Sequence, residues 1–165
     1  MNLSLMLHMP RWLVVFTIPQ GSALQKGRHG LYHEIVNAAA NVHERFGVYS
    51  WCSDSQLYYC GSFAQDYANG GFRSNLHGRI DNYLQNHKIK DTGHKNTNLV
   101  VFENINDALK QESVALKYLT FDSLHLGEDL VDYNAFSNNP DLVHSVESLV
   151  ICSYRRIGQC GWNRT

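Results

Sequence analysis

The chain has 165 residues, of which 44% are hydrophobic and 18% are charged, and its formal net charge is −1. This length and composition indicate one folded domain with a core of ordinary size, and they exclude a disordered chain. The near-neutral charge argues against a protein that binds nucleic acid without specificity, but it is compatible with a DNA enzyme whose basic residues are local.

The first 30 residues are expected to form an N-terminal extension of uncertain order, ahead of a single domain at residues 31–165. Arg11 interrupts their apolar run and no basic segment precedes it, so we do not expect a signal peptide. The alternatives are an extra strand at Trp12–Ile18 or a poorly ordered extension. No stretch is long enough to span a membrane, so we expect no membrane partner and a cytoplasmic location.

A helix is predicted at the start of the domain, from Leu31 to Arg45. Its apolar residues recur at helical spacing, and three consecutive alanines favour the helical state. We expect this helix to pack on a sheet.

Residues 46–61 predict two short strands joined by the polar turn Ser53–Gln56. Each strand has a tyrosine in a glycine-containing triplet, GVY at 47–49 and YCG at 59–61. Side chains alternate between the two faces of a strand, so a register with Tyr49 opposite Tyr59 puts both phenols on one face. A shift of one residue would put them on opposite faces.

A polar loop at residues 62–74 precedes a second predicted helix, and it is longer than most connections between elements. Ser74 or Asn75 can cap this helix, which is expected to run to about Asn86. Arg79 and Tyr83 lie one turn apart on the edge of its apolar stripe.

Four further elements are predicted in the second half of the chain. A buried strand at Leu99–Phe102 precedes a helix at Ile105–Tyr118. A short helix is expected within Leu124–Tyr133, and an amphipathic segment, Leu142–Ile151, is expected to run into a strand at Leu149–Tyr154.

Glu112 falls in the middle of the apolar face of the helix predicted at Ile105–Tyr118. Burying a carboxylate there without a partner costs several kcal/mol. Glu112 therefore needs a cation, strong hydrogen bonds or an open cleft, and two interpretations remain: a structural pair within the protein, or a ligand of a metal ion.

The four cysteines, at positions 52, 60, 152 and 160, do not have the spacing of a zinc site. Cys60 is expected to be a small buried thiol within its strand. A disulfide between Cys52 and Cys60 is the alternative, and a reducing compartment argues against it.

The two glycine–tyrosine triplets, followed by Arg79 on a helix and then by Glu112, resemble the GIY-YIG nuclease family. The resemblance covers about residues 47–121. It implies an α/β (α+β) fold with a small, mainly antiparallel three-stranded sheet and flanking helices. It also implies a metal-dependent endonuclease that hydrolyses DNA, such as a type II restriction-like enzyme.

In this resemblance Tyr49 lies near the attacking water, Tyr59 orients it, and Arg79 stabilises the phosphate. Glu112 holds one Mg²⁺ or Mn²⁺ ion. Tyr83 stands where the family often has His, and it lacks the near-neutral pKa of that residue.

The resemblance further implies DNA as the partner. Arg73, Lys88, Lys90 and Lys95 could contact its backbone. The family usually adds an Asn to the site, and the candidates are Asn134, Asn138, Asn139 and Asn163, with Asn134 preferred. A restriction role favours a homodimer, because two strands need two sites. The alternatives are a noncatalytic nucleic-acid-binding module on the same scaffold and a structural domain whose motif is coincidental.

Overall fold

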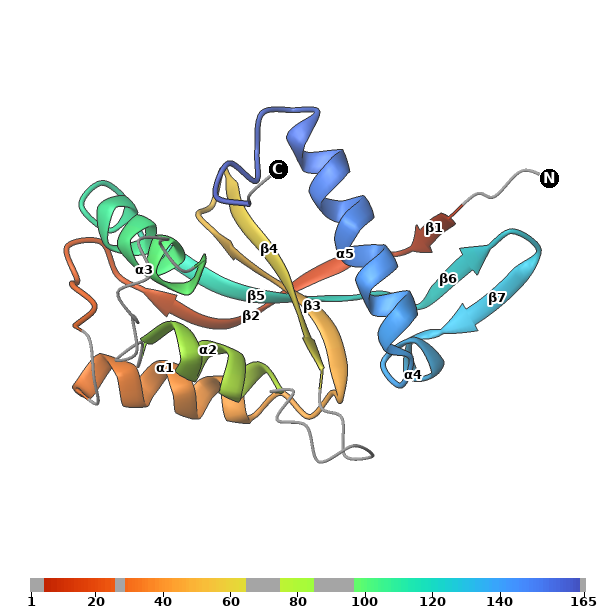
Figure 1. Ribbon diagram of the computed structural model, residues 1–165, viewed down its shortest axis with the longest axis horizontal. Coiled ribbons are helices and arrows are strands. Elements are labelled where there is room, and N and C mark those ends of the chain that lie inside the picture. Colours follow the sequence, from red (N-terminus) through yellow and green to blue (C-terminus); the bar gives the residue numbers. More distant parts are fainter. Residues whose placement is uncertain (1–4, 26–28, 65–74, 85–96, 164–165) are drawn as a thin grey trace.

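The computed structural model describes residues 5–25, 29–64, 75–84 and 97–163 (Figure 1). Its elements follow one another in the order β1 (Leu5–His8), β2 (Arg11–Ile18), α1 (Gly30–Ala40), β3 (Phe46–Cys52), β4 (Leu57–Ala64), α2 (Leu76–Leu84), α3 (Thr97–Ala108), β5 (Val114–Thr120), β6 (Ser123–Leu126), β7 (Asp129–Asp132), α4 (Tyr133–Phe136) and α5 (Pro140–Arg155).

Two antiparallel sheets make up the β-structure of the described residues. One has four strands in the order β2-β5-β3-β4, and the other has three in the order β1-β6-β7. The mixed α+β class is therefore confirmed. The prediction of one three-stranded sheet is wrong in its strand number, because β2 adds a fourth strand to the sheet that holds the hairpin.

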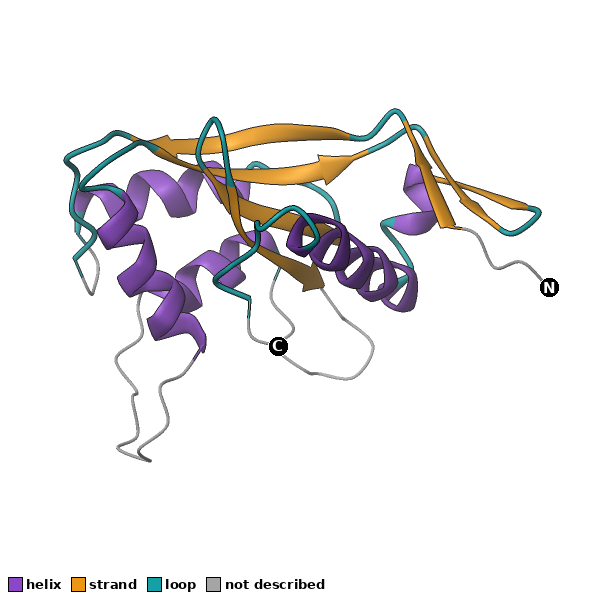
Figure 2. Ribbon diagram, turned by 90° about the horizontal axis from the view of Figure 1, so that it is seen from above, coloured by secondary structure: helices purple, strands orange, loops and turns teal. Residues whose placement is uncertain are grey.

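Helices cover both faces of the four-stranded sheet. In both views the β3–β4 hairpin lies between α1, α2 and α3 on one side and α5 on the other (Figure 1, Figure 2). Alternation along β3 sends Tyr49 and Trp51 into the core shared with α1–α3, and sends Val48 and Cys52 into the core shared with α5. The sheet is thus the middle layer between two apolar cores.

Besides the two strands of the predicted hairpin, three predicted elements match the structure in type and place. The extra strand at Trp12–Ile18 is β2, and the first predicted helix is α1. The helix that carries Arg79 is α2, where the Asn75 side chain accepts a hydrogen bond from the Gly78 N–H at 2.9 Å. Asn75 is therefore the residue that caps it.

Other predicted elements are wrong. Leu99–Phe102 belongs to helix α3, and the helix predicted at Ile105–Tyr118 ends at Ala108, before a turn and strand β5. The helix predicted within Leu124–Tyr133 is the β6–β7 hairpin, apart from Tyr133 in α4. The strand predicted at Leu149–Tyr154 is part of helix α5. Among the described helices, none is both long and apolar enough to cross a bilayer.

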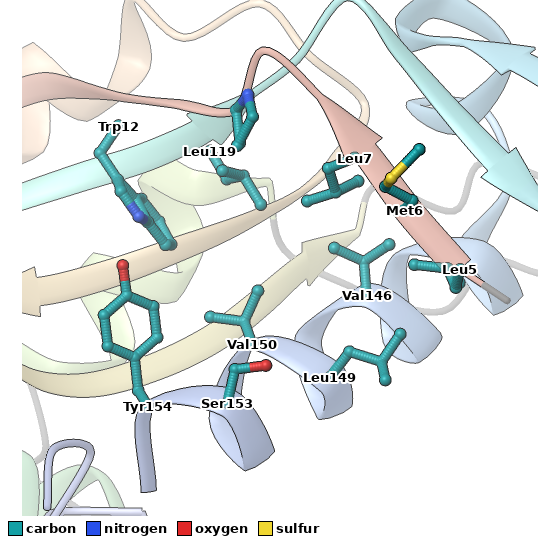
Figure 3. A pocket seen from close by; sticks show the side chains of 11 residues that line it. Leu5, Met6, Leu7, Trp12, Leu119, Val146, Leu149, Val150, Ser153 and Tyr154 are labelled. Atoms are coloured by element: carbon teal, nitrogen blue, oxygen red, sulfur yellow. The ribbon is translucent and has the colours of Figure 1, made fainter. Parts of the chain in front are cut away.

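Strand β1 lies beside α5 and leaves a hollow of about 430 Å³ between them (Figure 3). Its walls are mostly aliphatic, with Leu5 and Leu7 from β1 and Val146 and Val150 from α5. Ser153 and Tyr154 add two hydroxyls, but no carboxylate, imidazole or cation lines the hollow. It is therefore a packing feature and not a candidate active site.

Candidate active site

The β3–β4 hairpin brings Tyr49 and Tyr59 together on the face that packs against α1–α3. Tyr49 pairs with Gly61, and Trp51 pairs with Tyr59. The register predicted from the sequence, Tyr49 opposite Tyr59, is therefore wrong by two residues. A shift of two preserves the face, so the rings are diagonal neighbours whose centroids lie 6.1 Å apart.

Each glycine of the two triplets lies under an aromatic ring of the opposite strand. A methyl group added at Gly61 would lie 2.7 Å from Tyr49 Oη, and one added at Gly47 would lie 2.5 Å from Phe63 Cζ. Both distances are shorter than any ordinary carbon contact. The glycines thus allow the Tyr49 and Phe63 rings to lie flat across the hairpin.

Helix α2 adds Tyr83 and Arg79 to this group. The hydroxyls of Tyr49 and Tyr83 are hydrogen-bonded to each other. The Tyr83 ring also packs edge-on against Tyr59, with centroids 6.2 Å apart. One turn earlier, the exposed side chain of Arg79 reaches the outer edge of β4, where its Nε donates to the Ser62 carbonyl oxygen at 3.1 Å.

The three phenols differ in their exposure. Tyr49 is 1% exposed and Tyr83 is 3% exposed, whereas Tyr59 is only partly buried. Burial raises the pKa of Tyr49 and Tyr83 well above the ordinary value. The Tyr59 phenol adds to both rises and Arg79 opposes both, whereas the hydrogen bond with Tyr49 lowers the pKa of Tyr83. Tyr49 and Tyr83 are therefore neutral at physiological pH, where they can orient groups but cannot act as phenolates.

A second polar group lies on the other face of β4, where α5 packs. The Ser62 hydroxyl is 3.1 Å from His144 Nδ1, and the same nitrogen is 3.4 Å from a carboxylate oxygen of Glu147. Glu147 also acts electrostatically on the buried Cys60 thiol, whose pKa is raised by burial first and by this carboxylate second. His144 and Glu147 therefore lie over Cys60 and Ser62, next to the backbone oxygen that binds Arg79.

Glu112 lies elsewhere than the sequence predicted. It sits in the turn between α3 and β5, not on a helix, and its carboxylate accepts a hydrogen bond from the Tyr58 hydroxyl. Tyr58 is in turn stacked on Trp162, with centroids 4.5 Å apart. The apolar helical face that seemed to surround Glu112 is divided between a helix end and a strand, so the predicted environment of this carboxylate is wrong.

The four candidate asparagines have different positions. Asn138 donates to the Asn134 carbonyl oxygen at 2.8 Å, and Asn139 caps α5. Asn163 alone of the four pairs with β4, where its side chain accepts from the Cys60 N–H at 2.9 Å and donates to the Cys60 carbonyl oxygen at 2.7 Å. It therefore lies at the strand that carries Tyr59, whereas the preferred candidate, Asn134, is in α4.

The predicted DNA contacts Arg73, Lys88, Lys90 and Lys95 lie outside the described residues. The four cysteines are free thiols, so the disulfide alternative is not realised. Within the described ranges, no three His, Cys, Asp or Glu side chains form a group that could hold a metal ion.

Comparisons of the chain with protein-family models, with curated proteins and with solved structures find no match.

Sequence reasoning missed His144 and Glu147 because it placed a helix-to-strand transition within residues 142–154. A stronger signal was present at Asn139-Pro140-Asp141, where a capping residue is followed by Pro at the first helical position and by an acidic residue in the first turn. From that start, one helix puts Val143, Val146 and Val150 on one stripe with Glu147 beside it.

Proposed function

We propose that the protein is a metal-dependent endonuclease that hydrolyses DNA phosphodiester bonds. One observation carries this proposal: three segments far apart in the sequence converge on the outer edge of β4. The hairpin contributes Tyr49 and Tyr59, α2 contributes Arg79, and α5 contributes His144 and Glu147. A cation, a carboxylate and phenols are the groups that phosphodiester hydrolysis uses, and here they surround β4, with the phenols on one face and the carboxylate on the other.

Arg79 is the group proposed to hold the phosphate. Its guanidinium is anchored by one hydrogen bond to the Ser62 carbonyl oxygen, and the side chain is exposed to solvent. A planar cation fixed in this way can donate two parallel hydrogen bonds to phosphate oxygens and offset the charge that develops on them.

Tyr59 is the phenol best placed to touch substrate, because Tyr49 and Tyr83 are buried. Tyr49 is proposed to act through its neighbours: its hydroxyl fixes Tyr83, and the two rings pack against Tyr59. The attacking water would be oriented by Tyr59. The pKa of Tyr49 is raised by burial, so that phenol is not the base that deprotonates the water.

Glu147 suits the metal better than Glu112 does. Its side chain is 22% exposed and lies 3.4 Å from His144 Nδ1, which in turn is 3.1 Å from the Ser62 hydroxyl. Carboxylate and hydroxyl oxygens are the donors that Mg²⁺ and Mn²⁺ prefer, and such ions keep several waters when a protein supplies one carboxylate. A bound ion would polarise the phosphate and stabilise the leaving oxygen. Glu112 accepts a hydrogen bond from the Tyr58 hydroxyl and has no such hydroxyl–imidazole pair at its side among the described contacts.

DNA cleavage by matched variants tests the proposal. Plasmid and phage DNA are incubated with Mg²⁺, Mn²⁺ or EDTA and with wild type, Arg79→Ala, Glu147→Gln, Glu112→Gln and Glu128→Gln. We expect metal-dependent cutting that falls at least about 100-fold in Arg79→Ala and Glu147→Gln. Glu128→Gln, on the exposed β6–β7 turn, should cut like wild type. Discrete fragments would indicate a restriction-type enzyme, for which a homodimer is the expected form.

The outcome for Glu112→Gln decides between the two carboxylates. Activity near the wild-type level in Glu112→Gln supports Glu147 as the metal ligand. Loss of activity in Glu112→Gln, with activity retained in Glu147→Gln, would instead identify Glu112 as the ligand. If folded wild-type protein leaves DNA uncut with both Mg²⁺ and Mn²⁺, the proposal of a nuclease is wrong.

The second candidate function is a noncatalytic nucleic-acid-binding module, which the burial of Tyr49 and Tyr83 favours because it removes two phenols from the surface. Its affinity for DNA should be unchanged in Glu147→Gln and should fall in Lys88→Ala, Lys90→Ala and Lys95→Ala, with a salt slope that decreases by about one for each lysine removed.

A further inference from the structure

A polar pocket of about 230 Å³ lies on the α5 side of the four-stranded sheet, beside the turn that joins β3 to β4. Ser50 and Cys52 of β3 and Lys117 of β5 line it, and Tyr154 from the last turn of α5 closes one side. None of the side chains proposed for phosphodiester hydrolysis lines this pocket.

Ser50 supplies a hydroxyl whose neighbour in the described fold is the Cys52 thiol, a weak acceptor. The residue is 0% exposed, and its Oγ has no hydrogen-bond partner within the described part of the chain. A buried hydroxyl without a partner costs about 1–3 kcal/mol, and an alanine would fill the same strand position without that cost. The side chain lines the pocket, so a molecule in the pocket can accept a hydrogen bond from the hydroxyl.

Lys117 brings a positive charge to the same place. It is the cross-strand partner of Ser50, so the two side chains rise from adjacent strands on one face of the sheet. Burial raises the pKa of the neighbouring Cys52 thiol, and the Lys117 ammonium and the Ser50 hydroxyl oppose this rise. The Cys52 thiol donates to the Ala115 carbonyl oxygen at 3.7 Å. A thiol is a weak acceptor, so Lys117 keeps donors for a better one.

We propose that this pocket binds a small ligand through one anionic group, whose oxygens accept hydrogen bonds from the Ser50 hydroxyl and the Lys117 ammonium. The volume is below the range of about 300–1,000 Å³ that is usual for drug-sized ligands, so the ligand is small. Asp54 also lines the pocket and adds a negative charge, so a ligand with one anionic group is favoured over a polyanion such as a DNA backbone. A carboxylate and a phosphate share the required chemistry.

The test is a titration of ¹⁵N-labelled full-length protein with sodium phosphate and, separately, with sodium acetate, each matched to sodium chloride at equal ionic strength. We expect saturable shifts of the Ser50, Cys52 and Lys117 amide signals with one of the two anions, and none with chloride. Saturation by phosphate identifies a phosphorylated ligand, and saturation by acetate identifies a carboxylate.

Variants separate binding from structure. Lys117→Gln should lower the affinity for the anion at least about tenfold. Lys110→Gln changes an exposed lysine that is paired with Asp107, and it should leave the affinity unchanged. Ser50→Ala should weaken binding several-fold and yet raise the unfolding temperature of the free protein, because it removes a buried hydroxyl without a partner. Equal shifts with chloride, or Ser50→Ala that lowers stability and leaves binding unchanged, would overturn the proposal.

Discussion

Two aromatic rings explain why glycine stands at positions 47 and 61. Alanine is tolerated in strands, and here it would remove conformational entropy from the unfolded chain at little cost to the backbone. The obstacle is the ring above each position, at less than 3.0 Å from an added Cβ. The Tyr49 ring cannot retreat easily, because it is buried and its hydroxyl is bonded to Tyr83. Packing within the hairpin thus explains the glycine of each triplet.

Gly61→Ala should therefore lower the free energy of unfolding by about 1–3 kcal/mol, the usual cost of an extra methyl group in a well-packed core. Urea unfolding followed by tryptophan fluorescence measures this. Gly161→Ala is the matched control, since its added Cβ meets nothing within 4 Å. Equal stability of the two variants would show that Tyr49 moves aside freely.

The buried phenols predict how stability depends on pH. Tyr49 and Tyr83 have a folded-state pKa raised by burial, whereas in the unfolded chain they ionise at about 10. Above that pH the unfolded state releases protons that the folded state retains, so the free energy of unfolding falls as pH rises. Below it both states are protonated, and the contribution is fully present.

We expect the slope of stability against pH above 10 to become shallower in the variant Tyr49→Phe/Tyr83→Phe. Denaturant unfolding at pH 9, 10 and 11 measures the slope, and absorbance at 295 nm counts the phenolates that appear before unfolding. An unchanged slope would mean that these two phenols ionise in the folded state.

At the scale of elements, α5 and the segment that follows it complete the site around β4. The helix packs on β4 and β3, and residues 159–163 then run along the outer edge of β4. The Cys160 N–H donates to the Leu57 carbonyl oxygen at 2.7 Å, and the Trp162 N–H donates to the Tyr58 carbonyl oxygen at 3.0 Å. The Asn163 side chain continues this row of hydrogen bonds at Cys60. Residues 159–163 thereby cover the outer edge of β4, which would otherwise be open to pairing with another strand.

Asn163→Asp tests this edge with nearly no change in shape. The carboxylate can still accept from the Cys60 N–H, but its second oxygen faces the Cys60 carbonyl oxygen, where the amide donated before. We expect a loss of about 2 kcal/mol at pH 7, measured by urea unfolding. The loss should shrink at acid pH, because the protonated carboxyl group of the variant can donate again.

Asn138→Asp is the control for the same chemical change at an exposed hydrogen bond, and it should cost less than about 1 kcal/mol. If both variants lose a similar free energy of unfolding, the cause is the added charge itself and not the hydrogen bonds of Asn163 with the edge of β4.

The elements nearest the motif could be predicted from sequence because local signals agree there. The β3–β4 hairpin has turn residues between alternating strands, and α2 has a capping residue ahead of an apolar stripe. Only the predicted register of the hairpin, with Tyr49 opposite Tyr59, is wrong. The last pair before the turn is Cys52 with Leu57, four residues form the turn, and the pairing is irregular between Trp51 and Cys52. Local sequence does not specify such an irregularity.

The second half of the chain could not be predicted because short apolar runs do not distinguish a helix from a strand. Leu99–Phe102 was assigned to a strand and is helical, and Leu149–Tyr154 is helical although it contains strand-forming residues. Leu109, Leu116 and Leu119 mimic one helical face across the end of α3 and the start of β5. Because of that coincidence, the sequence pattern places Glu112 on an apolar helical face, whereas no such pattern marks Glu147.

At the scale of the whole molecule, one sheet connects both apolar cores. Strand β3 is buried along its whole length and is paired on both sides, by β4 and by β5. The smaller sheet is different: β7 is mostly exposed and pairs only with β6. Opening β3 requires both cores to separate, whereas opening β7 removes four cross-strand pairs.

Hydrogen–deuterium exchange followed by mass spectrometry should therefore rank these strands. We expect the amides of β3 to exchange only through global unfolding, with the same sensitivity to urea as the unfolding transition. Those of β7 should exchange at least about 100-fold faster and with little dependence on urea, because their opening exposes little new surface. Protection of β7 equal to that of β3 would show that the smaller sheet unfolds only with the larger one. If the difference in protection disappears as protein concentration rises, β7 is covered by a second copy, as the proposed restriction-type homodimer allows.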